Sequence, residues 1–389
     1  MFAPCATRHA VILAAGESKR TRPLTSQRPK PLIPLAGRAL LAHILDELHG
    51  LVDRVTLVVG YRAAMLESAF GTHYRGIALQ YHVQPRVNGT ASALLTVADV
   101  VREPFFMLYG DNLISRLDVL GVCGQRYCMA ALPVEDARAF GVLDIDTDNM
   151  VRRIIEKPAT PPPHALANPG IFHFDAEVFD AARNIRPSPR GEYELTDVIE
   201  LLAARHGVAY TVCAGHWVPV GTPWEALSAA QFALAYRSPH GISGDATIGA
   251  GTHIEGAVQI GSATIGANCR IVGPTRIGDG SVIGAGATII GSSLDAAVQI
   301  GAGTTLRDAQ IGAGARIGAS CLVESSLLDS AARIGDAAQL AAAEFTELRP
   351  VAHTAGLLSA TQLRTRGAVI AENTTVAAGA CVAPGSVIV

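Results

Sequence analysis

Residues 13–34 read LAAGESKRTRPLTSQRPKPLIP, and this stretch decides how the first part of the chain folds. The apolar run at 10–15 predicts a buried strand that ends at Gly16 and passes into a loop. That loop has no acidic residue after Glu17 and carries five basic ones: Lys19, Arg20, Arg22, Arg28 and Lys30. A glycine at a strand end lets backbone N–H groups approach an anion, and basic side chains supply the charge that a polyphosphate needs. The stretch predicts a phosphate site, and a solvated basic loop fits the spacing about equally well.

Two better-known phosphate motifs are absent, because no G-x-G-x-x-G follows the strand and no G-x-x-x-x-G-K-[ST] occurs. The pattern L-A-A-G-x-x-x-R-x-R-P-L-T-x-x-x-P-K-P-L instead resembles the signature of the sugar-1-phosphate nucleotidyltransferases. These enzymes join an NTP to a hexose 1-phosphate and release pyrophosphate. The resemblance implies that Arg20 and Lys30 contact phosphates as catalytic residues. It also implies a nucleotide-binding strand end made of Leu13, Ala15 and Gly16.

Strands and helices alternate from residue 10 to about residue 236. The periodicity predicts helices at 40–48 and 63–70 and strands at 55–59 and 77–83. Such alternation indicates an α/β, Rossmann-like domain with a mixed, mostly parallel sheet. Ligands of such sheets bind beyond the carboxyl ends of the strands, and Gly16 lies at one of these ends.

The stretch QPRVNGTASAL at 84–94 follows another predicted strand. Taken alone, it fits an ordinary turn and helix cap, or a helix N-terminus that receives an anion or a base edge. The pattern Q-x-x-x-x-G-T-A-x-A-L resembles the family's nucleotide-binding loop. That resemblance implies that Gln84 and Gly89 read the base and that Thr90 belongs to the same nucleotide site.

The stretch PFFMLYGD at 104–111 predicts an apolar strand that ends in one carboxylate. A lone aspartate in this position is usually a turn former or a helix cap. It can also hold a hard cation against phosphate oxygens. Because the resembled family carries this element as its magnesium ligand, we expect Asp111 to bind Mg²⁺ and the nucleotide.

Three later segments resemble the sugar-phosphate pocket of the same family: FGV at 140–142, IIEKP at 154–158 and NPGIFHF at 168–174. Glu156 and Lys157 alone would pass for an exposed pair at a strand end. The resemblance implies that Glu156 binds sugar hydroxyls and that Lys157 binds the sugar phosphate as a catalytic residue. It adds Gly141, Asn168 and Gly170 to the sugar-phosphate site. The segment RPSPRGEYELTD at 186–197 resembles glucose-1-phosphate thymidylyltransferases, and its polar residues fit caps or supporting positions.

Two positions depart from the family pattern. Ser18 stands where a second glycine is more common, and the segment WVPVGTPWEAL at 217–227 has Pro219 where the family carries a second magnesium-binding aspartate. A proline side chain cannot coordinate a cation. Magnesium keeps several waters, so a site with Asp111 and substrate phosphates is chemically tolerable. Weaker metal binding and loss of turnover both fit this substitution.

After a predicted linker at 237–243, apolar residues recur about every six positions and are often followed by glycine. They are Ile248, Ile254, Ile260, Ile265, Ile271, Ile277, Ile283, Ile289, Leu294, Ile300, Leu306, Ile311 and Ile317. The period fades at about 341–367 and returns at Ile370, Val376, Val382 and Ile388. This hexapeptide array predicts a left-handed parallel β-helix over 244–389, after an α/β domain over 1–236.

The array resembles hexapeptide acyltransferases, and archaeal relatives with this layout also acetylate an amino-sugar phosphate. That chemistry needs a general-base histidine in the last coils. His253 lies early, His353 lies in the irregular segment, and Asp336 stands near the expected position. We therefore expect the array to serve mainly in assembly, because side-by-side packing of such prisms usually makes trimers or higher multiples.

The composition limits the classes of function. A chain of 389 residues favours two domains, and a net charge of −3 argues against a general nucleic-acid or membrane surface. Seven cysteines without a C-x-x-C pair suggest a reducing compartment and no zinc site. With no signal-peptide pattern and no long apolar run, we expect a cytoplasmic protein.

The combined expectation is an enzyme that transfers a nucleotidyl group from an NTP to a hexose 1-phosphate. The resemblance favours dTTP or UTP and glucose 1-phosphate. The first alternative is a weak or inactive regulatory subunit that binds a sugar nucleotide, as Pro219 and Ser18 suggest. The second is a bifunctional enzyme that also acetylates an aminohexose 1-phosphate with acetyl-CoA.

Overall fold

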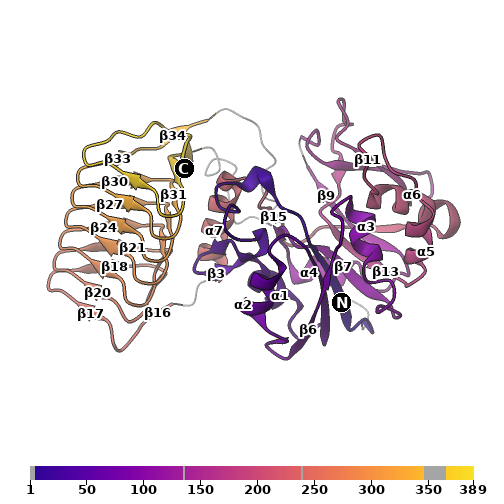
Figure 1. Cartoon of the computed structure of the whole chain (residues 1–389), viewed down its shortest axis with the longest axis horizontal. Coiled ribbons are helices and arrows are strands. Elements are labelled where there is room, and N and C mark those ends of the chain that lie inside the picture. The colour runs from indigo at the N-terminus through magenta and orange to yellow at the C-terminus, as the bar shows by residue number, and fades with distance from the viewer. Residues whose placement is uncertain (1–4, 135, 238–239, 346–364) are drawn as a thin grey trace.

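The computed structural model describes residues 5–134, 136–237, 240–345 and 365–389, which form an α/β part and a stack of short strands side by side (Figure 1). The α/β sheet has the strand order β11-β10-β12-β9-β13-β7-β1-β4-β6-β5, with β14 beside β9. Among the described residues, no helix is long and apolar enough to cross a membrane. The predicted α/β domain followed by a β-helix is confirmed, and its boundaries at 236 and 244 stay predictions.

Four parallel strands make the centre of the α/β sheet: β1 (His9–Ala14), β4 (Arg54–Val59), β6 (Ile77–Val83) and β7 (Phe105–Tyr109). Antiparallel pairing begins beyond β7, at β13 (Ile171–Phe174) and β9 (Cys128–Pro133). The rest of this sheet comprises β10 (Gly141–Ile145), β11 (Val151–Glu156), β12 (Leu166–Ala167), β14 (Ala209–Val212) and β5 (His73–Tyr74). The parallel centre and the antiparallel half therefore meet at β7.

Alternate residues of β1 point to opposite faces of the sheet, as the period of a strand requires. Ala10 and Ile12 join one apolar cluster, and Val11 joins the other. Helices α1 (Leu40–Leu48), α4 (Arg116–Gly121) and α7 (Pro223–Arg237) contribute to the first cluster. Helices α3 (Thr90–Leu95), α5 (Val178–Arg183) and α6 (Leu195–His206) contribute to the second. The first sheet face also carries α2 (Ala63–Phe70), whose Leu66 is buried there.

The loop after β1 contains two single-turn helices, η1 (Lys19–Thr21) and η2 (Lys30–Leu32). A small hairpin of β2 (Pro34–Leu35) and β3 (Arg38–Ala39) follows. A second short pair joins β8 (Asn112–Leu113) to β15 (Val218–Pro219). These elements bring distant parts of the chain to the carboxyl ends of the central strands.

The second domain is a parallel β-helix with three sheets, whose inward residues form one apolar cluster. The first sheet comprises β16 (Gly241–Ile242), β19 (Val258–Ile260), β22 (Thr275–Ile277), β25 (Ser293–Leu294), β28 (Gln310–Ile311), β31 (Leu327–Leu328), β36 (Ala368–Ile370) and β38 (Ser386–Ile388). The second comprises β17 (Thr247–Ile248), β20 (Thr264–Ile265), β23 (Val282–Ile283), β26 (Gln299–Ile300), β29 (Arg316–Ile317), β32 (Arg333–Ile334) and β37 (Thr375–Val376). The third comprises β18 (His253–Glu255), β21 (Arg270–Val272), β24 (Thr288–Ile290), β27 (Thr305–Arg307), β30 (Leu322–Glu324) and β33 (Gln339–Leu340).

The predicted break in the repeat falls within the stack without changing its register. Ile311 pairs with Leu328, and Leu328 pairs in the same way with Ile370 despite the much longer separation in sequence. The described part of the break contains β34 (Ala343–Glu344) paired with β35 (Thr365–Arg366). His353 lies outside the described residues.

One expectation from the cysteines is wrong. Cys5 and Cys123 form a disulfide with a Cα–Cα distance of 5.9 Å, although the sequence suggested cysteines kept reduced. Their separation of 118 residues carries no pairing signal of its own. The free cysteines Cys128, Cys213, Cys269 and Cys321 are buried, and Cys381 is exposed.

Candidate active site

The predicted nucleotide residues gather where the central parallel strands end. The N–H of Gly110 donates to the carbonyl of Leu13 over 2.9 Å, which ties the end of β7 to that of β1. The N–H of Tyr61 donates to the carbonyl of Ala15 over 3.1 Å, and Gly16 lies exposed just beyond. The strand ends therefore form one edge, where an α/β sheet binds its ligands.

Lys30 and Asp111 meet at this edge. The Lys30 Nζ lies 3.0 Å from Asp111 Oδ2, and its side chain is only 6% exposed, against 47% for Asp111. The Asn112 amide donates to the other carboxylate oxygen over 2.9 Å. A buried ammonium needs a partner, and Asp111 supplies one while it stays open to solvent. The pair presents one cation and one carboxylate to whatever enters the site.

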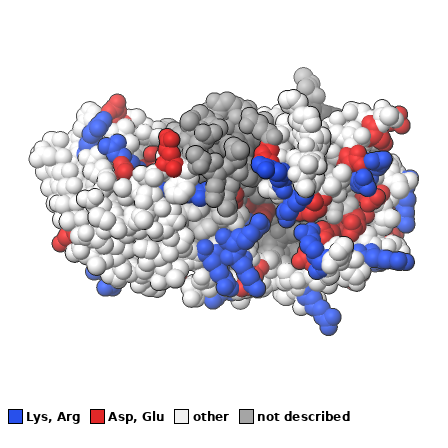
Figure 2. All heavy atoms as spheres, turned by 90° about the horizontal axis from the view of Figure 1, so that it is seen from above, with Lys and Arg blue, Asp and Glu red and all other residues white. Residues whose placement is uncertain are grey.

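The other basic residues of the loop have different roles, which corrects the expectation of one phosphate-binding group. Lys19 and Arg22 both pair with Glu17. Arg28 lies 2.8 Å from Asp329 of the β-helix, on the far side of the loop. Within the described residues, Arg20 is exposed with no hydrogen bond or ion pair, so Arg20 and Lys30 remain the phosphate candidates. Figure 2 shows that most basic side chains on this face of the molecule gather on the α/β domain, next to acidic ones.

The predicted base-reading loop is held by a distant segment. Gln84 is 5% exposed, and its amide donates to the carbonyl of Gly89 over 3.4 Å. Gly89 has a φ of 120°, and a Cβ there would overlap the backbone of Tyr193. The Thr90 hydroxyl accepts the N–H of Leu195 over 2.9 Å. The segment 186–197 therefore supports this loop through the backbone of Tyr193 and Leu195. Glu194 precedes α6 without a side-chain capping bond, and the supporting roles of the other polar residues stay predictions.

The predicted sugar-phosphate residues lie together on the antiparallel half. Gly141 pairs with Glu156 across β10 and β11, and a Cβ at Gly141 would lie 3.1 Å from the Glu156 carboxylate. The Lys157 Nζ lies 3.0 Å from Glu156 Oε1, and its backbone has a φ of 47°. Asn168 donates its N–H to the Gly141 carbonyl over 2.9 Å and accepts the N–H of Gly170. All five predicted residues therefore belong to one cluster.

Tyr109 joins the two halves, and the sequence interpretation missed it. Its hydroxyl interacts with Thr90 on the nucleotide side and Asn168 on the sugar side. Burial raises its pKa, and the nearby carboxylates of Asp111 and Glu156 raise it further. A Cβ at Gly170 would overlap the Tyr109 ring, so this glycine is needed for close packing. The available signal was the stretch FFMLYGD, in which a tyrosine lies two residues before the aspartate.

Pro219 lies beside the candidate metal ligand. It pairs with Asn112 across β15 and β8, and the N–H of Val220 donates to the Asp111 carbonyl over 3.2 Å. Among the described residues, no three His, Cys, Asp or Glu side chains converge to hold a metal. One solvent-facing carboxylate fits a magnesium ion that takes its remaining oxygens from phosphates and water. Among the described residues, Asp111 is the carboxylate at this edge that would hold such an ion.

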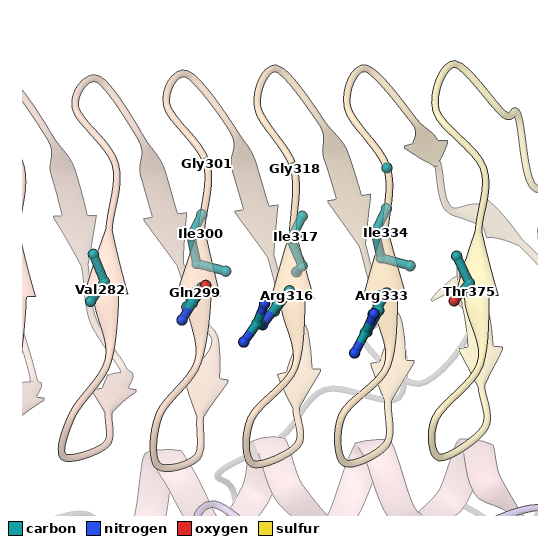
Figure 3. Close-up of a pocket in the computed structure, with 11 residues that line it drawn as sticks. Val282, Gln299, Ile300, Gly301, Arg316, Ile317, Gly318, Arg333, Ile334 and Thr375 are labelled. Carbon is teal, nitrogen blue, oxygen red and sulfur yellow. The ribbon is translucent and has the colours of Figure 1, made fainter.

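Of the candidate acetyl-transfer residues, the two that the structure describes, His253 and Asp336, have separate structural contacts. His253 is 68% exposed and pairs with Glu255 over 3.7 Å. Asp336 accepts the N–H of Ala319 over 2.7 Å and thereby holds a corner of the β-helix. A groove of about 570 Å³ lies on the outer face of β26, β29 and β32 (Figure 3). Its lining includes Gln299, Arg316, Arg333 and Thr375 but no histidine, cysteine or carboxylate that could act as a base.

Comparison with known proteins places this geometry in a class. Residues 9–235 match the model of the nucleotidyl transferase family, so the chain belongs to that family. Residues 262–291 match the bacterial transferase hexapeptide model. Both findings confirm the resemblance seen in the sequence.

Among its relatives, the bifunctional protein GlmU of Methanocaldococcus jannaschii is 36% identical over 225 residues, 58% of this chain and 54% of the relative. The UTP–glucose-1-phosphate uridylyltransferase AglF of Haloferax volcanii is 35% identical over 201 residues, 50% of this chain and 82% of the relative. A crystal structure of a putative glucose-1-phosphate thymidylyltransferase from Bacillus anthracis, with sucrose, aligns with a TM-score of 0.53 and 27% identity. It covers 60% of this chain and 98% of its own. The chain spans about half the length of the GlmU relatives.

Proposed function

We propose that the chain transfers a nucleotidyl group from an NTP to a hexose 1-phosphate and releases pyrophosphate. The observation that carries this proposal is the position of Tyr109. Its N–H donates to the Gly170 carbonyl over 2.9 Å and its ring packs against Gly170 on the sugar side. Asp111, which pairs with Lys30, follows two residues later on the nucleotide side. Two charged pairs on either side of one tyrosine suit two phosphorylated substrates whose phosphates must meet.

The reaction is an in-line displacement at the α-phosphorus of the NTP. The attacking oxygen belongs to the sugar phosphate and already carries charge, so the protein needs neither a nucleophile nor a general base. The main barrier is repulsion between two anions. Arg20 and Lys30 neutralise the NTP phosphates, and Lys157 neutralises the sugar phosphate and orients it. When bound at Asp111, Mg²⁺ supplies further charge neutralisation.

We further propose that dTTP or UTP and glucose 1-phosphate are the preferred substrates. The names of AglF and of the Bacillus anthracis structure support glucose 1-phosphate, and they support a pyrimidine nucleotide. The segment RPSPRGEYELTD supports the same choice, because it resembles the matching segment of glucose-1-phosphate thymidylyltransferases.

The proposal is tested by measuring pyrophosphate release from the purified protein in the presence of Mg²⁺. Each NTP is combined in turn with each hexose 1-phosphate of a small panel. We expect one preferred pair, and a loss of at least ~100-fold in turnover for Arg20→Ala and Asp111→Asn. Arg183→Ala is the matched control, because Arg183 is an exposed arginine on α5 that pairs with Asp180. Full turnover in either site variant, with the control unchanged, would refute the assigned roles.

Pro219 favours a second candidate, a regulatory subunit that binds a sugar nucleotide without turning it over. Its position beside Asp111 leaves the site with one carboxylate where the resembled family has two. Tight binding of a sugar nucleotide, with no magnesium-dependent pyrophosphate exchange, would establish this role. Thiol release from acetyl-CoA with an aminohexose 1-phosphate would instead establish the bifunctional alternative.

Assembly through the β-helix remains part of the proposal. We propose a homo-oligomer, a trimer or a higher multiple, in which β-helices pack side by side. The outer face of β26, β29 and β32, with its shallow groove, is exposed and leaves room for such packing. Sedimentation velocity of the full chain measures the oligomer size, and a monomer at micromolar concentration would contradict the proposal.

A further inference from the structure

The β-helix contacts the loop after β1, which carries Arg20 and Lys30, through a nearly buried ion pair. We call this loop, residues 16–33, the catalytic loop. Arg28 Nη1 donates to Asp329 Oδ1 over 2.8 Å, and Arg28 Nη2 lies 3.7 Å from Glu372 Oε2. The side chain of Arg28 is 13% exposed and that of Asp329 is 3% exposed. A nearly buried ion pair of this kind holds its two side chains in one arrangement, because separating them would leave a buried charge without a partner.

Asp329 is itself held firmly by the β-helix. It follows β31, and its N–H donates to the Ile370 carbonyl over 2.9 Å, which continues the ladder to the next coil. The Asp329 carboxylate also accepts the N–H of Ser330 over 2.7 Å. The anchor for Arg28 is therefore part of a regular sheet rather than a loose surface side chain.

Only Pro29 separates Arg28 from Lys30. Proline fixes its own φ, and η2 begins directly after it, so a displacement of Arg28 moves the backbone of Lys30. From the other side, Arg62 reaches the Ser26 carbonyl over 3.2 Å. The loop is thus clamped between the α/β domain and the β-helix, with Lys30 aimed at Asp111.

A second contact touches the same segment beyond Lys30. Gly37 has a φ of 77° in the turn between β2 and β3, and a Cβ there would overlap the guanidinium of Arg276. Arg276 belongs to β22 and donates to the Leu294 carbonyl over 3.1 Å. Figure 1 shows β3 and α7 on the side of the α/β domain that faces the β-helix. The β-helix therefore contacts the segment on both sides of Lys30.

We propose that Arg28 is a positioning residue, through which the β-helix sets the place of Lys30 against the NTP phosphates. The inference rests on the proposed nucleotidyl transfer and adds a task for the β-helix within it. A stack of coils that only served assembly would have no need to grip a catalytic loop.

Steady-state kinetics of Arg28→Ala and Asp329→Ala test the proposal in the full chain. We expect kcat/KM for the NTP to fall roughly 10- to 100-fold, with KM for the NTP raised and KM for the hexose 1-phosphate unchanged, because misplacement by about 1 Å has that effect. A partly unfolded enzyme loses active fraction, which lowers kcat but moves neither KM. The double variant is expected to be no worse than the poorer single variant, because both act through one contact. Arg28→Lys is expected to recover part of the loss.

Gln231→Ala is the matched control, since Gln231 on α7 donates to the Asp308 carbonyl across the same domain interface but does not contact the loop. Its turnover is expected to equal that of the wild type. A kcat/KM for the NTP in Arg28→Ala within twofold of that of an active wild type overturns the proposal, as do multiplicative losses in the double variant.

Hydrogen exchange separates a failure of this inference from a failure of the proposed function. In Arg28→Ala and Asp329→Ala, amide exchange over 19–37 is expected to rise several-fold, and in Gln231→Ala it is expected to stay as in the wild type. Inactive wild-type protein with this exchange pattern would refute nucleotidyl transfer and keep the structural clamp. Unchanged amide exchange over 19–37 in both variants would refute the proposal that the β-helix holds this loop in place, whether or not the protein is active.

Discussion

Two faces of the β-helix are built from the same repeat but meet different surroundings. Both point isoleucines and leucines inward, such as Ile311 and Ile317. The two faces differ in their outward-facing residues, which form one row on each face because equivalent positions of successive coils pair with each other. The row on the first sheet, against the α/β domain, includes Arg276, Ser293, Gln310, Leu327 and Val369, and the row on the second sheet includes Val282, Gln299, Arg316, Arg333 and Thr375.

The row on the first sheet is the covered row: its Gln310 and Leu327 are 3% and 4% exposed. The row on the second sheet is the open row, and its side chains are exposed to solvent. Leu327 and Val369 even belong to the apolar cluster of the α/β domain. The inward period therefore specifies the coil, and the outward residues specify what each face meets.

The covered row is not an ordinary apolar core. Among the residues that the structure describes, the Ser293 hydroxyl, one Asp295 oxygen and both polar atoms of the Gln310 amide are buried without a hydrogen bond, although this Asp295 oxygen lies 3.6 Å from Arg276 Nη1. Such groups are costly to bury. The covered row therefore combines buried polar groups with apolar ones.

The largest expected effect comes from removing apolar contact on the covered row. Leu327→Ala is expected to lower the free energy of unfolding by about 2–4 kcal/mol, because it leaves a cavity between the two domains. Val282→Ala on the open row removes a 46% exposed side chain and is expected to cost less than about 0.5 kcal/mol. Urea titration followed by tryptophan fluorescence measures both, and equal losses would break the comparison between the faces.

A smaller effect follows from Asp295, whose carboxyl lies at the covered face. Burial raises its pKa to about 6 from 3.8; Arg276 and Arg28 lower it, and Asp329 raises it. The folded protein therefore holds this proton more tightly than the unfolded chain, so stability falls as pH rises from about 4 to about 6. Asp295→Asn removes that loss and is expected to be more stable than the wild type by about 1–3 kcal/mol at pH 7.5.

Unfolding titrations of the wild type and Asp295→Asn at pH 4 and pH 7.5 check this sign. The two proteins are expected to differ less at pH 4, where the folded state holds this carboxyl neutral and the unfolded chain is only about half ionised. A difference that shrinks as pH rises would mean that Arg276, 3.6 Å away, compensates the buried charge fully.

The smallest effect is expected on the open row. Arg316 and Arg333 are cross-strand partners, and the described residues offer neither of them an acidic partner. Like charges in this position are unfavourable, so Arg316→Thr is expected to raise the free energy of unfolding by about 0.2–0.5 kcal/mol at low salt. The gain is expected to vanish in about 1 M NaCl, where charges are screened. A clear loss of stability on this substitution would contradict the expected repulsion between the two arginines.

The local patterns in the sequence predicted the repeat and the strand ends, and they selected residues that the structure brings together, whose roles in binding and catalysis stay predictions. Asp111 and Lys30 were each assigned from their own motif, and the fold explains why they meet: both follow strands of the same parallel sheet. Tyr109 was missed because its importance comes from partners on two separate segments, Thr90 and Asn168. The pairing of Arg28 was missed for a stronger reason, since Asp329 lies 301 residues away and nothing in the basic loop distinguishes Arg28 from its neighbours.

The register of the β-helix across its break has a consequence for how such chains change length. Leu328 meets Ile370 and Arg333 meets Thr375, so the coils on either side stack as direct neighbours. The β-helix can therefore accept an inserted segment between two strands, provided that the next strand pairs in the same register. Material gained there alters no later coil, whereas a single residue gained within a strand would turn every inward side chain of that strand outward. Insertions at the corners between strands can therefore lengthen this protein, in evolution or by design, without changing the sequence or pairing of the other coils.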